Sequence, residues 1–341
     1  MSHALASHLS GLLPSARALV AGAIVASARL ARAVFARALP AFAPLASMSW
    51  HGKASAFGNW RPARTQRAVA TGVVLALCLS AGPGMAQPEL VRIPAEEVEL
   101  VAALYRPSGP GPHPAVIALH GCGGLFNRAG APTARHADWG QRLADAGFLV
   151  VMPDSFRSRG LGSQCGISTR SVRPSRERVA DVLATKIWLQ ARSDVKASAV
   201  SLLGWSNGGS TVLAAVRSDR RPGDASPDLA RAIAFYPGCR GQAESSSFRT
   251  RVPLLIMIGE ADDWTPAAPC KALAEAARAR GEALDLKLYA GAYHDFDHPG
   301  RPVTERRDLA FTADGSGTAR AGTNPAARQD ALVRVPAFLA R

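Results

Sequence analysis

Short runs of apolar residues alternate with stretches of helical periodicity along residues 87–341 of this 341-residue chain. The apolar runs predict strands at 98–105, 115–119, 148–152, 199–203, 232–236, 254–258 and 284–289. The helical stretches predict helices at 136–146, 176–191, 207–217, 267–280 and 325–335. Strands that are apolar throughout and separated by helices are typical of a mostly parallel sheet with helices on both faces. The pattern therefore predicts a single α/β domain over 87–341.

A long interruption precedes the last predicted helix. Residues 301–323 are rich in Gly, Thr and Arg, which predicts a loop. The helix that follows is expected to begin at Pro325 with Asn324 as its N-cap, and Pro336 is expected to end or kink it.

Composition supports a folded core and the charge distribution separates the first 86 residues from the rest. Apolar residues make up 48% of the chain and charged residues 19%, which excludes a generally disordered, collagen-like or small disulfide-framework protein. Residues 1–86 contain eight basic residues and no acidic one, so residues 87–341 carry only +6 of the chain's net charge of +14. Most of the basicity that would suggest binding to nucleic acid or a membrane surface therefore lies outside the predicted domain.

The segment before that domain has the pattern of a secretory signal. Residues 68–81 are uncharged and mostly apolar, follow three arginines and precede the small residues Gly84 and Ala86. This order predicts a signal peptide region over 48–86 with cleavage after Ala86. The apolar stretch is shorter than the roughly 20 residues of a membrane span, so no stable membrane insertion is expected after cleavage. An N-terminal anchor that stays attached is the alternative.

Residues 1–47 are surplus to such a signal. We favour a start set too early, with the true start at or near Met48; a disordered or Arg/Ala-rich targeting extension, similar to an organelle transit peptide, is the alternative. Export predicts a periplasmic or secreted protein.

Export also changes the interpretation of the cysteines. Cys78 lies within the signal, which leaves four cysteines in an oxidising compartment, Cys122, Cys165, Cys239 and Cys270. Joining neighbouring loops of the predicted sheet gives the pairs Cys122–Cys165 and Cys239–Cys270, with free buried thiols as the alternative. No cysteine or histidine spacing indicates zinc, and no metal is expected.

A G-x-S-x-G motif lies between a predicted strand and a predicted helix. The sequence Gly204-Trp205-Ser206-Asn207-Gly208-Gly209 directly follows strand 199–203. In this context the motif is typical of a nucleophile elbow, where glycines permit a sharp turn and expose the serine hydroxyl at a helix N-terminus. The serine needs a base, and the base needs a carboxylate, in the chain order serine, acid, histidine.

Both partners occur in that order, each after a strand. Asp262 follows strand 254–258 and is the expected acid, with Asp263 and then Glu260 as alternatives. His294 follows strand 284–289 and is the expected base, with His298 as its rival.

An oxyanion hole requires two backbone amides near the nucleophile. The amide of Asn207, directly after the serine, is one candidate. The loop His120-Gly121-Cys122-Gly123-Gly124 follows an early strand, and the Cys122 amide is the other candidate, with His120 expected to stabilise the loop.

Five motifs in this order, H-G-C-G-G, P-D-S-F-R-S-R-G, G-W-S-N-G-G, G-E-A-D-D-W-T-P and A-Y-H-D-F, resemble the dienelactone hydrolase family of α/β-hydrolases. The resemblance covers about residues 95–340. It implies the α/β-hydrolase fold and hydrolysis of an ester or lactone without a cofactor. The chain departs from dienelactone hydrolases proper, which are cytoplasmic and have a cysteine nucleophile and a carboxylate near the oxyanion loop. Ser206 and the export signal therefore favour a serine esterase.

The resemblance also implies that an arginine near the P-D-S-F-R-S-R-G loop binds a substrate carboxylate. Arg157 and Arg159 are the candidates, with solvated surface charge as the alternative, and Trp205 beside the serine is a further candidate contact. Asp154 is expected to hold the turn of this loop.

These residues predict a serine hydrolase that cleaves a small-molecule carboxylic ester or lactone through an acyl-enzyme. The alternative is dienelactone hydrolysis proper, or polyester hydrolysis or acyl transfer with the same three residues. The elbow is also similar to that of secreted polyester hydrolases. A non-catalytic exported protein that binds anions is the alternative from another class, and nucleic acid is not an expected partner. The sequence leaves the substrate, its chain length and the oligomeric state open.

Overall fold

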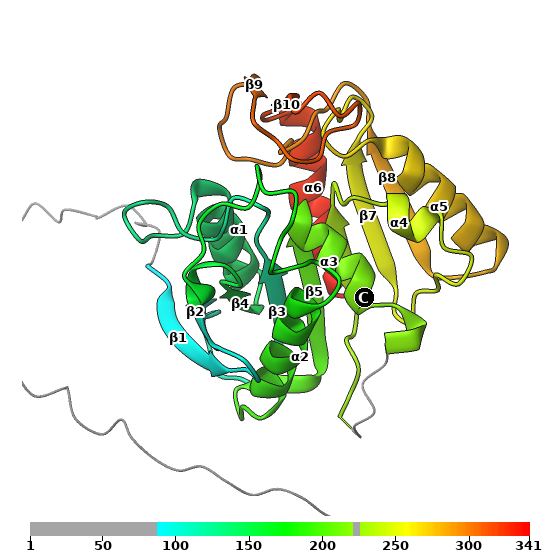
Figure 1. Cartoon of the computed structure of the whole chain (residues 1–341). Coiled ribbons are helices and arrows are strands. Elements are labelled where there is room, and N and C mark those ends of the chain that lie inside the picture. The colour runs from blue at the N-terminus through cyan, green and yellow to red at the C-terminus, as the bar shows by residue number, and fades with distance from the viewer. Residues whose placement is uncertain (1–86, 221–225) are drawn as a thin grey trace, which may run out of the picture. The chain divides into compact units, whose positions relative to one another are not determined.

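A computed structural model describes residues 87–220 and 226–341. The predicted signal peptide and the extension before it lie outside the described residues. The central element is an eight-stranded sheet in the order β1-β2-β4-β3-β5-β6-β7-β8 (Figure 1). Its strands are β1 (Glu89–Pro94), β2 (Glu99–Tyr105), β3 (His113–Leu119), β4 (Leu149–Pro153), β5 (Val195–Trp205), β6 (Ala232–Phe235), β7 (Leu254–Gly259) and β8 (Leu284–Tyr289).

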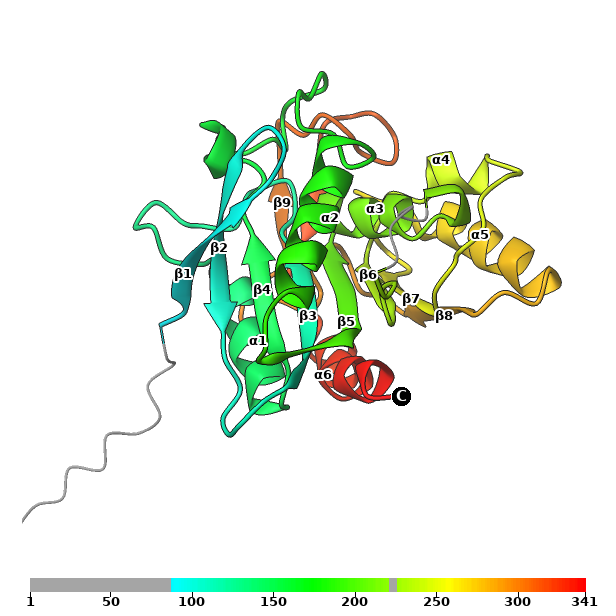
Figure 2. The same ribbon diagram turned by 90° about the horizontal axis from the view of Figure 1, so that it is seen from below.

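Within the sheet, the six neighbouring strands β4, β3, β5, β6, β7 and β8 all pair in parallel, whereas β1 and β2 are antiparallel to their neighbours. The helices are α1 (Ala134–Asp145), α2 (Glu177–Gln190), α3 (Asn207–Ala215), α4 (Arg240–Ala243), α5 (Ala267–Ala279) and α6 (Pro325–Leu339). Figure 2 shows α1 and α6 on one face of the sheet and α2 and α3 on the other. The predicted fold class, a mostly parallel sheet covered on both faces, is confirmed.

Burial explains why the apolar runs identified the strands. Every residue of β4, β6 and β7 is buried, as is typical of parallel strands with helices on both sides. Strand β1 was not predicted, because it lies at the sheet edge, is mostly exposed and has no continuous apolar run. Strand β5 is longer than predicted, since its first residues alternate between buried and exposed.

Two expectations for the C-terminal part were wrong. Within the predicted loop 301–323, β9 (Thr304–Arg306) and β10 (Ala319–Ala321) form a small antiparallel sheet. Helix α6 does not end near Val335 but continues through Pro336 to Leu339, because buried Val335, Phe338 and Leu339 keep its last turn packed on the core. A kink at Pro336, the other outcome expected there, stays a prediction. The Asn324 side chain caps this helix as predicted, by accepting a hydrogen bond from the Ala327 amide at 3.0 Å.

None of the helices within residues 87–220 and 226–341 combines the length and apolarity that a bilayer span needs.

Candidate active site

Ser206 occupies a sharp turn between β5 and α3. Its φ of 53° and ψ of −113° are unusual for a residue with a side chain. The turn depends on glycine at Gly208, where a Cβ would lie 2.2 Å from the Leu119 carbonyl oxygen, and at Gly204, where it would lie 2.4 Å from the Gly208 oxygen. The Ser206 amide donates to the Phe235 carbonyl at 2.9 Å, which ties the turn to the end of β6. The motif thus forms the strained elbow expected from the sequence.

Asp262 and His294 are hydrogen-bonded to each other at the ends of β7 and β8. The His294 Nδ1 to Asp262 Oδ2 distance is 2.8 Å, and both side chains are buried. The other oxygen, Asp262 Oδ1, accepts hydrogen bonds from the amides of Trp264 and Thr265 at 2.9 and 2.8 Å. A proton on Nδ1 leaves Nε2 as an acceptor, and Nε2 has no hydrogen-bond partner among the described residues.

The alternative acids and base are engaged elsewhere. The Asp263 carboxylate accepts from the Arg320 amide and guanidinium, each at 2.8 Å. Glu260 pairs with Lys271, and His298 Nδ1 accepts from the Gly300 amide. The structure therefore pairs Asp262, the first choice from the sequence, with His294.

The loop that carries Cys122 lies against the elbow. A methyl group on Gly121 would be 3.5 Å from Ser206 Cβ. Within the described residues, the amides of Cys122 and Asn207 donate to no other group. His120 is fully buried; its Nδ1 donates to the Gly121 carbonyl at 2.8 Å and its Nε2 accepts from the Ser155 amide at 3.1 Å. These contacts agree with a role of His120 in holding the loop.

Two disulfides join loops around the elbow. Cys122 is bonded to Cys165 and Cys239 to Cys270, which is the pairing predicted from the sequence. The first joins the loops after β3 and β4, and the second joins the segment after β6 to α5. Disulfides are typical of proteins from an oxidising compartment.

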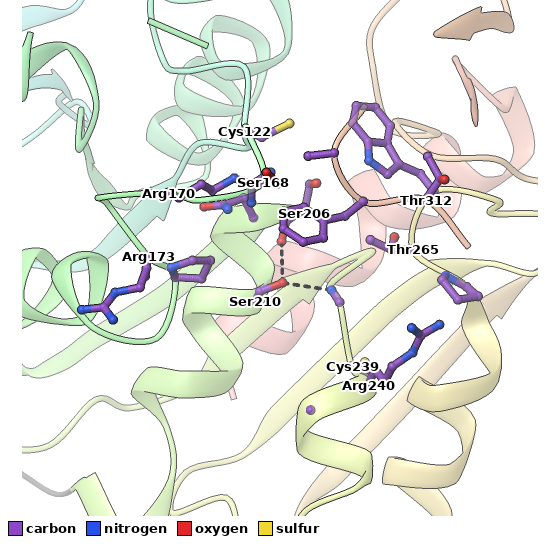
Figure 3. A pocket seen from close by; sticks show the side chains of 18 of the residues that line it. Cys122, Ser168, Arg170, Arg173, Ser206, Ser210, Cys239, Arg240, Thr265 and Thr312 are labelled. Atoms are coloured by element: carbon purple, nitrogen blue, oxygen red, sulfur yellow. Dashed lines mark hydrogen bonds between the residues drawn. The ribbon is translucent and has the colours of Figure 1, made fainter. Parts of the chain in front are cut away.

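A cavity of about 990 Å³ opens at Ser206 (Figure 3). Cys122 and Asn207 line it beside the serine, and Trp264 and Phe311 add aromatic surface. Its charged lining consists of Arg170, Arg173 and Arg240, and no carboxylate is present among the described residues that line it. In Figure 3, Arg170 and Arg173 lie on one side of Ser206 and Arg240 on the other.

The three arginines differ in how they are held. Arg170 Nε donates to the carbonyls of Gln164 and Ile167 at 3.0 and 3.1 Å, its guanidinium lies 4.7 Å from the centre of the Phe311 ring, and burial lowers its pKa. Arg173 pairs with Glu177 at 2.8 Å. Arg240 makes no ion pair or side-chain hydrogen bond within the part of the chain that is described.

The arginines and the tryptophan expected to contact substrate lie elsewhere. Arg159 forms two hydrogen bonds with Asp181, at 2.7 and 3.0 Å. Arg157 is exposed, lies over the Phe126 ring and lines a separate cavity of about 280 Å³. Trp205 is fully buried and its Nε1 donates to Asp297 Oδ2 at 2.8 Å. None of these three residues is among those that line the cavity at Ser206, and their contact with a substrate stays a prediction.

Asp154 does hold the turn of this loop, as expected. Its Oδ1 accepts from the amides of Phe156 and Arg157 at 2.9 and 3.0 Å.

A buried polar network behind His294 was not predicted. Asp297 accepts from Trp139 Nε1, Trp205 Nε1 and the Tyr236 hydroxyl at 2.6 to 2.8 Å, and burial raises the pKa of this carboxyl. Arg135 donates to the same tyrosine at 2.8 Å and pairs with Asp295, next to His294 in the chain. Burial opposes ionisation of Asp295, but Arg135 and Arg301 bring its pKa below the usual range. The spacing Asp295-Phe296-Asp297 was the available sequence signal.

A buried arginine supports the start of α3. Arg178 donates to Asn207 Oδ1 at 2.6 Å and to Ser155 Oγ at 3.3 Å. Burial lowers its pKa to about 10, so it remains a cation at neutral pH. Among the described residues, no group of three or more His, Cys, Asp or Glu is arranged to hold a metal ion.

The comparisons with known proteins agree with this architecture. A thermophilic esterase from Thermogutta terrifontis, solved with propionate bound, is 20% identical with a TM-score of 0.54, over 76% of this chain and 95% of that one. A candidate dienelactone hydrolase from Klebsiella pneumoniae is 21% identical with a TM-score of 0.55, over 74% of this chain and 98% of that one. A dienelactone hydrolase-like promiscuous phosphotriesterase from metagenomic libraries is 17% identical with a TM-score of 0.55, over 75% of this chain and 98% of that one.

At these identities the solved structures show a shared fold. No curated protein matches the chain. Residues 100–341, more than two thirds of the chain, match the model of the dienelactone hydrolase family. The eight-stranded sheet agrees with this match, which shows that the chain belongs to the dienelactone hydrolase family.

Proposed function

We propose that this protein is a serine hydrolase that cleaves a carboxylic ester or lactone through an acyl-enzyme. The observation that carries the proposal is the buried bond between His294 Nδ1 and Asp262, which leaves Nε2 as an acceptor. Ser206, Asp262 and His294 follow β5, β7 and β8, whose carboxyl ends lie at one edge of the parallel sheet. Residues at the end of β6 contact both the serine turn and the histidine. The centre of the Tyr236 ring is 4.4 Å from that of the His294 ring, and the carbonyl of Phe235, the residue before Tyr236, accepts a hydrogen bond from the Ser206 amide.

In the proposed reaction Ser206 Oγ attacks the carbonyl carbon and its proton passes to His294 Nε2. Asp262 stabilises the imidazolium and keeps the ring in the required tautomer. The oxyanion accepts hydrogen bonds from the amides of Cys122 and Asn207. Collapse of the tetrahedral intermediate breaks the bond to the alkoxy oxygen, which takes the proton from His294, and water then hydrolyses the acyl-enzyme by the same steps. In a lactone, the alcohol and the acid stay in one product.

The charge of the cavity supports an ester or lactone that carries an anionic group. Arginines bind carboxylates through charge-assisted hydrogen bonds. Arg173 is already paired with Glu177, whereas Arg170 and Arg240 have no carboxylate partner among the described residues. Arg240 is the strongest candidate, because its guanidinium is otherwise unpaired within the described part of the chain. The aromatic surfaces of Trp264 and Phe311 support an apolar portion in the same substrate.

We also propose that residues 87–341 form the exported, periplasmic or secreted enzyme. The two disulfides support an oxidising compartment, and the predicted signal peptide supports export.

Substitution of the serine tests the proposed function. Ser206→Ala is expected to lower kcat for a short-chain p-nitrophenyl ester by about 10⁴-fold or more, because the nucleophile is lost. A fluorophosphonate probe is expected to label Ser206 in the wild-type protein, as peptide mass mapping would show.

Ser201→Ala is the matched control, since Ser201 is another buried serine, which lies within β5 and does not line the cavity. It is expected to keep both activity and labelling. Hydrolysis that persists in Ser206→Ala would contradict the proposal, and binding of anions without any turnover would favour a non-catalytic protein.

A further inference from the structure

Cys122 provides the only side chain in a run of glycines. Gly121 precedes it and Gly123 and Gly124 follow it, and Gly124 has a φ of +89°. Glycine has more backbone freedom than any other residue, so the direction of the Cys122 amide depends on contacts that hold its peptide unit. The carbonyl of that unit, Gly121, accepts from His120 Nδ1 at 2.8 Å and from the Gly124 amide at 3.2 Å, which fixes one side of the loop. A donor that stabilises an oxyanion must nevertheless be held in place before the reaction.

Two further contacts hold the other side, at Cys122 itself, and both lead to the same neighbouring loop. The Cys122 carbonyl accepts from the Gln164 amide at 2.8 Å, and the side chain is bonded to Cys165. The loop of Gln164 and Cys165 is in turn anchored, because the Cys165 carbonyl accepts from the Ala310 amide at 2.9 Å. The disulfide therefore connects the glycine loop to a wall of the cavity that is held independently.

We infer that the Cys122–Cys165 disulfide is a positioning element, which holds the Cys122 amide in the direction that the tetrahedral intermediate requires. The inference rests on the proposed function, since it assumes that this amide stabilises the oxyanion. Its consequence is that turnover depends on the oxidation state of this pair. Because the ground-state ester does not yet carry the oxyanion charge, breaking the disulfide lowers kcat and leaves KM nearly unchanged.

The second disulfide gives an internal comparison. Cys239 and Cys270 are 2% and 0% exposed, whereas Cys122 is 7% exposed and Cys165 is half-buried. The two pairs enclose similar lengths of chain, with sequence separations of 43 and 31 residues, so their loss has a similar effect on the unfolded chain. The Cys239–Cys270 pair contains no proposed oxyanion donor.

Two single substitutions test the inference. Cys165→Ser breaks the first disulfide without changing Cys122, and Cys270→Ser breaks the second without changing Cys239; neither substituted residue lines the cavity. Cys165→Ser is expected to lower kcat by about 10- to 100-fold, less than the roughly 10²- to 10³-fold that accompanies complete loss of an oxyanion donor. Its KM is expected to stay within about twofold. Both substitutions are expected to lower the melting temperature by similar amounts. Cys270→Ser, in contrast to Cys165→Ser, is expected to keep kcat within about twofold.

Reduction of the folded wild-type protein provides a second measurement if Cys165→Ser does not fold. A dithiol reductant transfers two electrons and two protons to the Cys122–Cys165 pair and becomes a cyclic disulfide. Cys122–Cys165, the more exposed pair, is expected to be reduced before Cys239–Cys270. The fall in kcat should therefore follow the fraction of Cys122 and Cys165 that an alkylating reagent modifies, while Cys239 and Cys270 are still unmodified.

Three outcomes overturn the inference. Equal kcat values for Cys165→Ser and Cys270→Ser, or full activity after selective reduction of Cys122 and Cys165, overturn it while leaving the proposed function intact. Absence of Ser206-dependent hydrolysis in the oxidised wild-type protein overturns both.

Discussion

Burial separates the arginines around the elbow into two roles. Arg178 is fully enclosed and its guanidinium is used by Asn207 and Ser155, so replacing it would leave buried polar atoms unpaired. Arg240 lies in the cavity, where its positive charge is not neutralised by any described carboxylate. The first arginine therefore supports the start of α3, and the second is available to a ligand.

Removal of Arg240 is expected to weaken binding of anionic substrates selectively. For a p-nitrophenyl ester whose acyl group ends in a carboxylate, Arg240→Ala should raise KM by about tenfold, because one charge-assisted hydrogen bond contributes about 1.5–3 kcal/mol. The matched neutral ester should show little change. Arg278→Ala on α5 is the control, since Arg278 does not line the cavity. Equal effects on both esters would contradict an anion-binding role.

At the scale of elements, the turn from β5 into α3 is constrained by how closely α3 approaches β3. The Gly208 position leaves no room for a Cβ next to the Leu119 carbonyl at the end of β3. The same approach brings the N-terminus of α3, with the Asn207 amide, next to the loop after β3 that carries Cys122. Gly208 therefore permits both the strained turn and the close approach of the two proposed oxyanion donors, the amides of Asn207 and Cys122.

A methyl group at this contact is expected to be costly. Gly208→Ala should lower the free energy of unfolding by about 2–3 kcal/mol, measured by urea denaturation, because the backbone of β3 or α3 must move. Gly162→Ala is the control, since a Cβ there meets nothing within 4 Å. A wild-type stability for Gly208→Ala would show that the turn adapts more easily than the packing indicates.

For the whole molecule, buried histidines link stability to pH. Burial, together with nearby arginines, lowers the pKa of His120 and His136 well below the usual value, and burial and Arg301 lower that of His298 to about 4. An unfolded chain takes up protons at these histidines below about pH 6.5, while the folded protein does not. Stability is therefore expected to decrease as the pH falls from about 7 to 5.

Urea midpoints at several pH values between 7.5 and 5 would measure this decrease. His136→Gln is expected to make it smaller, because one proton uptake on unfolding is removed. The hydrogen bond between His136 Nδ1 and Thr133 Oγ1 is lost as well, which lowers stability at every pH but does not change the slope. A midpoint that does not change with pH would contradict the proposed linkage.

Much of the fold and the central part of the site could be predicted, because both depend on local features of the chain. Continuous apolar runs identified the buried parallel strands, and strand β1 escaped because an edge strand needs no such run. The turn chemistry around Ser206 and the order of Asp262 and His294 likewise placed these residues at strand ends. The short β9–β10 sheet and the continuation of α6 through Pro336 depend on packing against distant segments and were missed.

The sequence by itself therefore determined the fold class, the turn at Ser206, the strand ends that carry Asp262 and His294, and the pairing of the cysteines. The catalytic roles of these residues stay predictions. Only the tertiary structure decided which side chains surround the elbow: Arg159 turns to Asp181 and Trp205 to Asp297. Arg170, farther along the same connection between β4 and α2, and Arg240, at the start of α4, line the cavity instead. The physical reason is the distance along the chain over which each kind of interaction acts. Periodicity and turn chemistry act over a few residues, whereas the direction of a long side chain is set by partners that folding brings from distant parts of the chain.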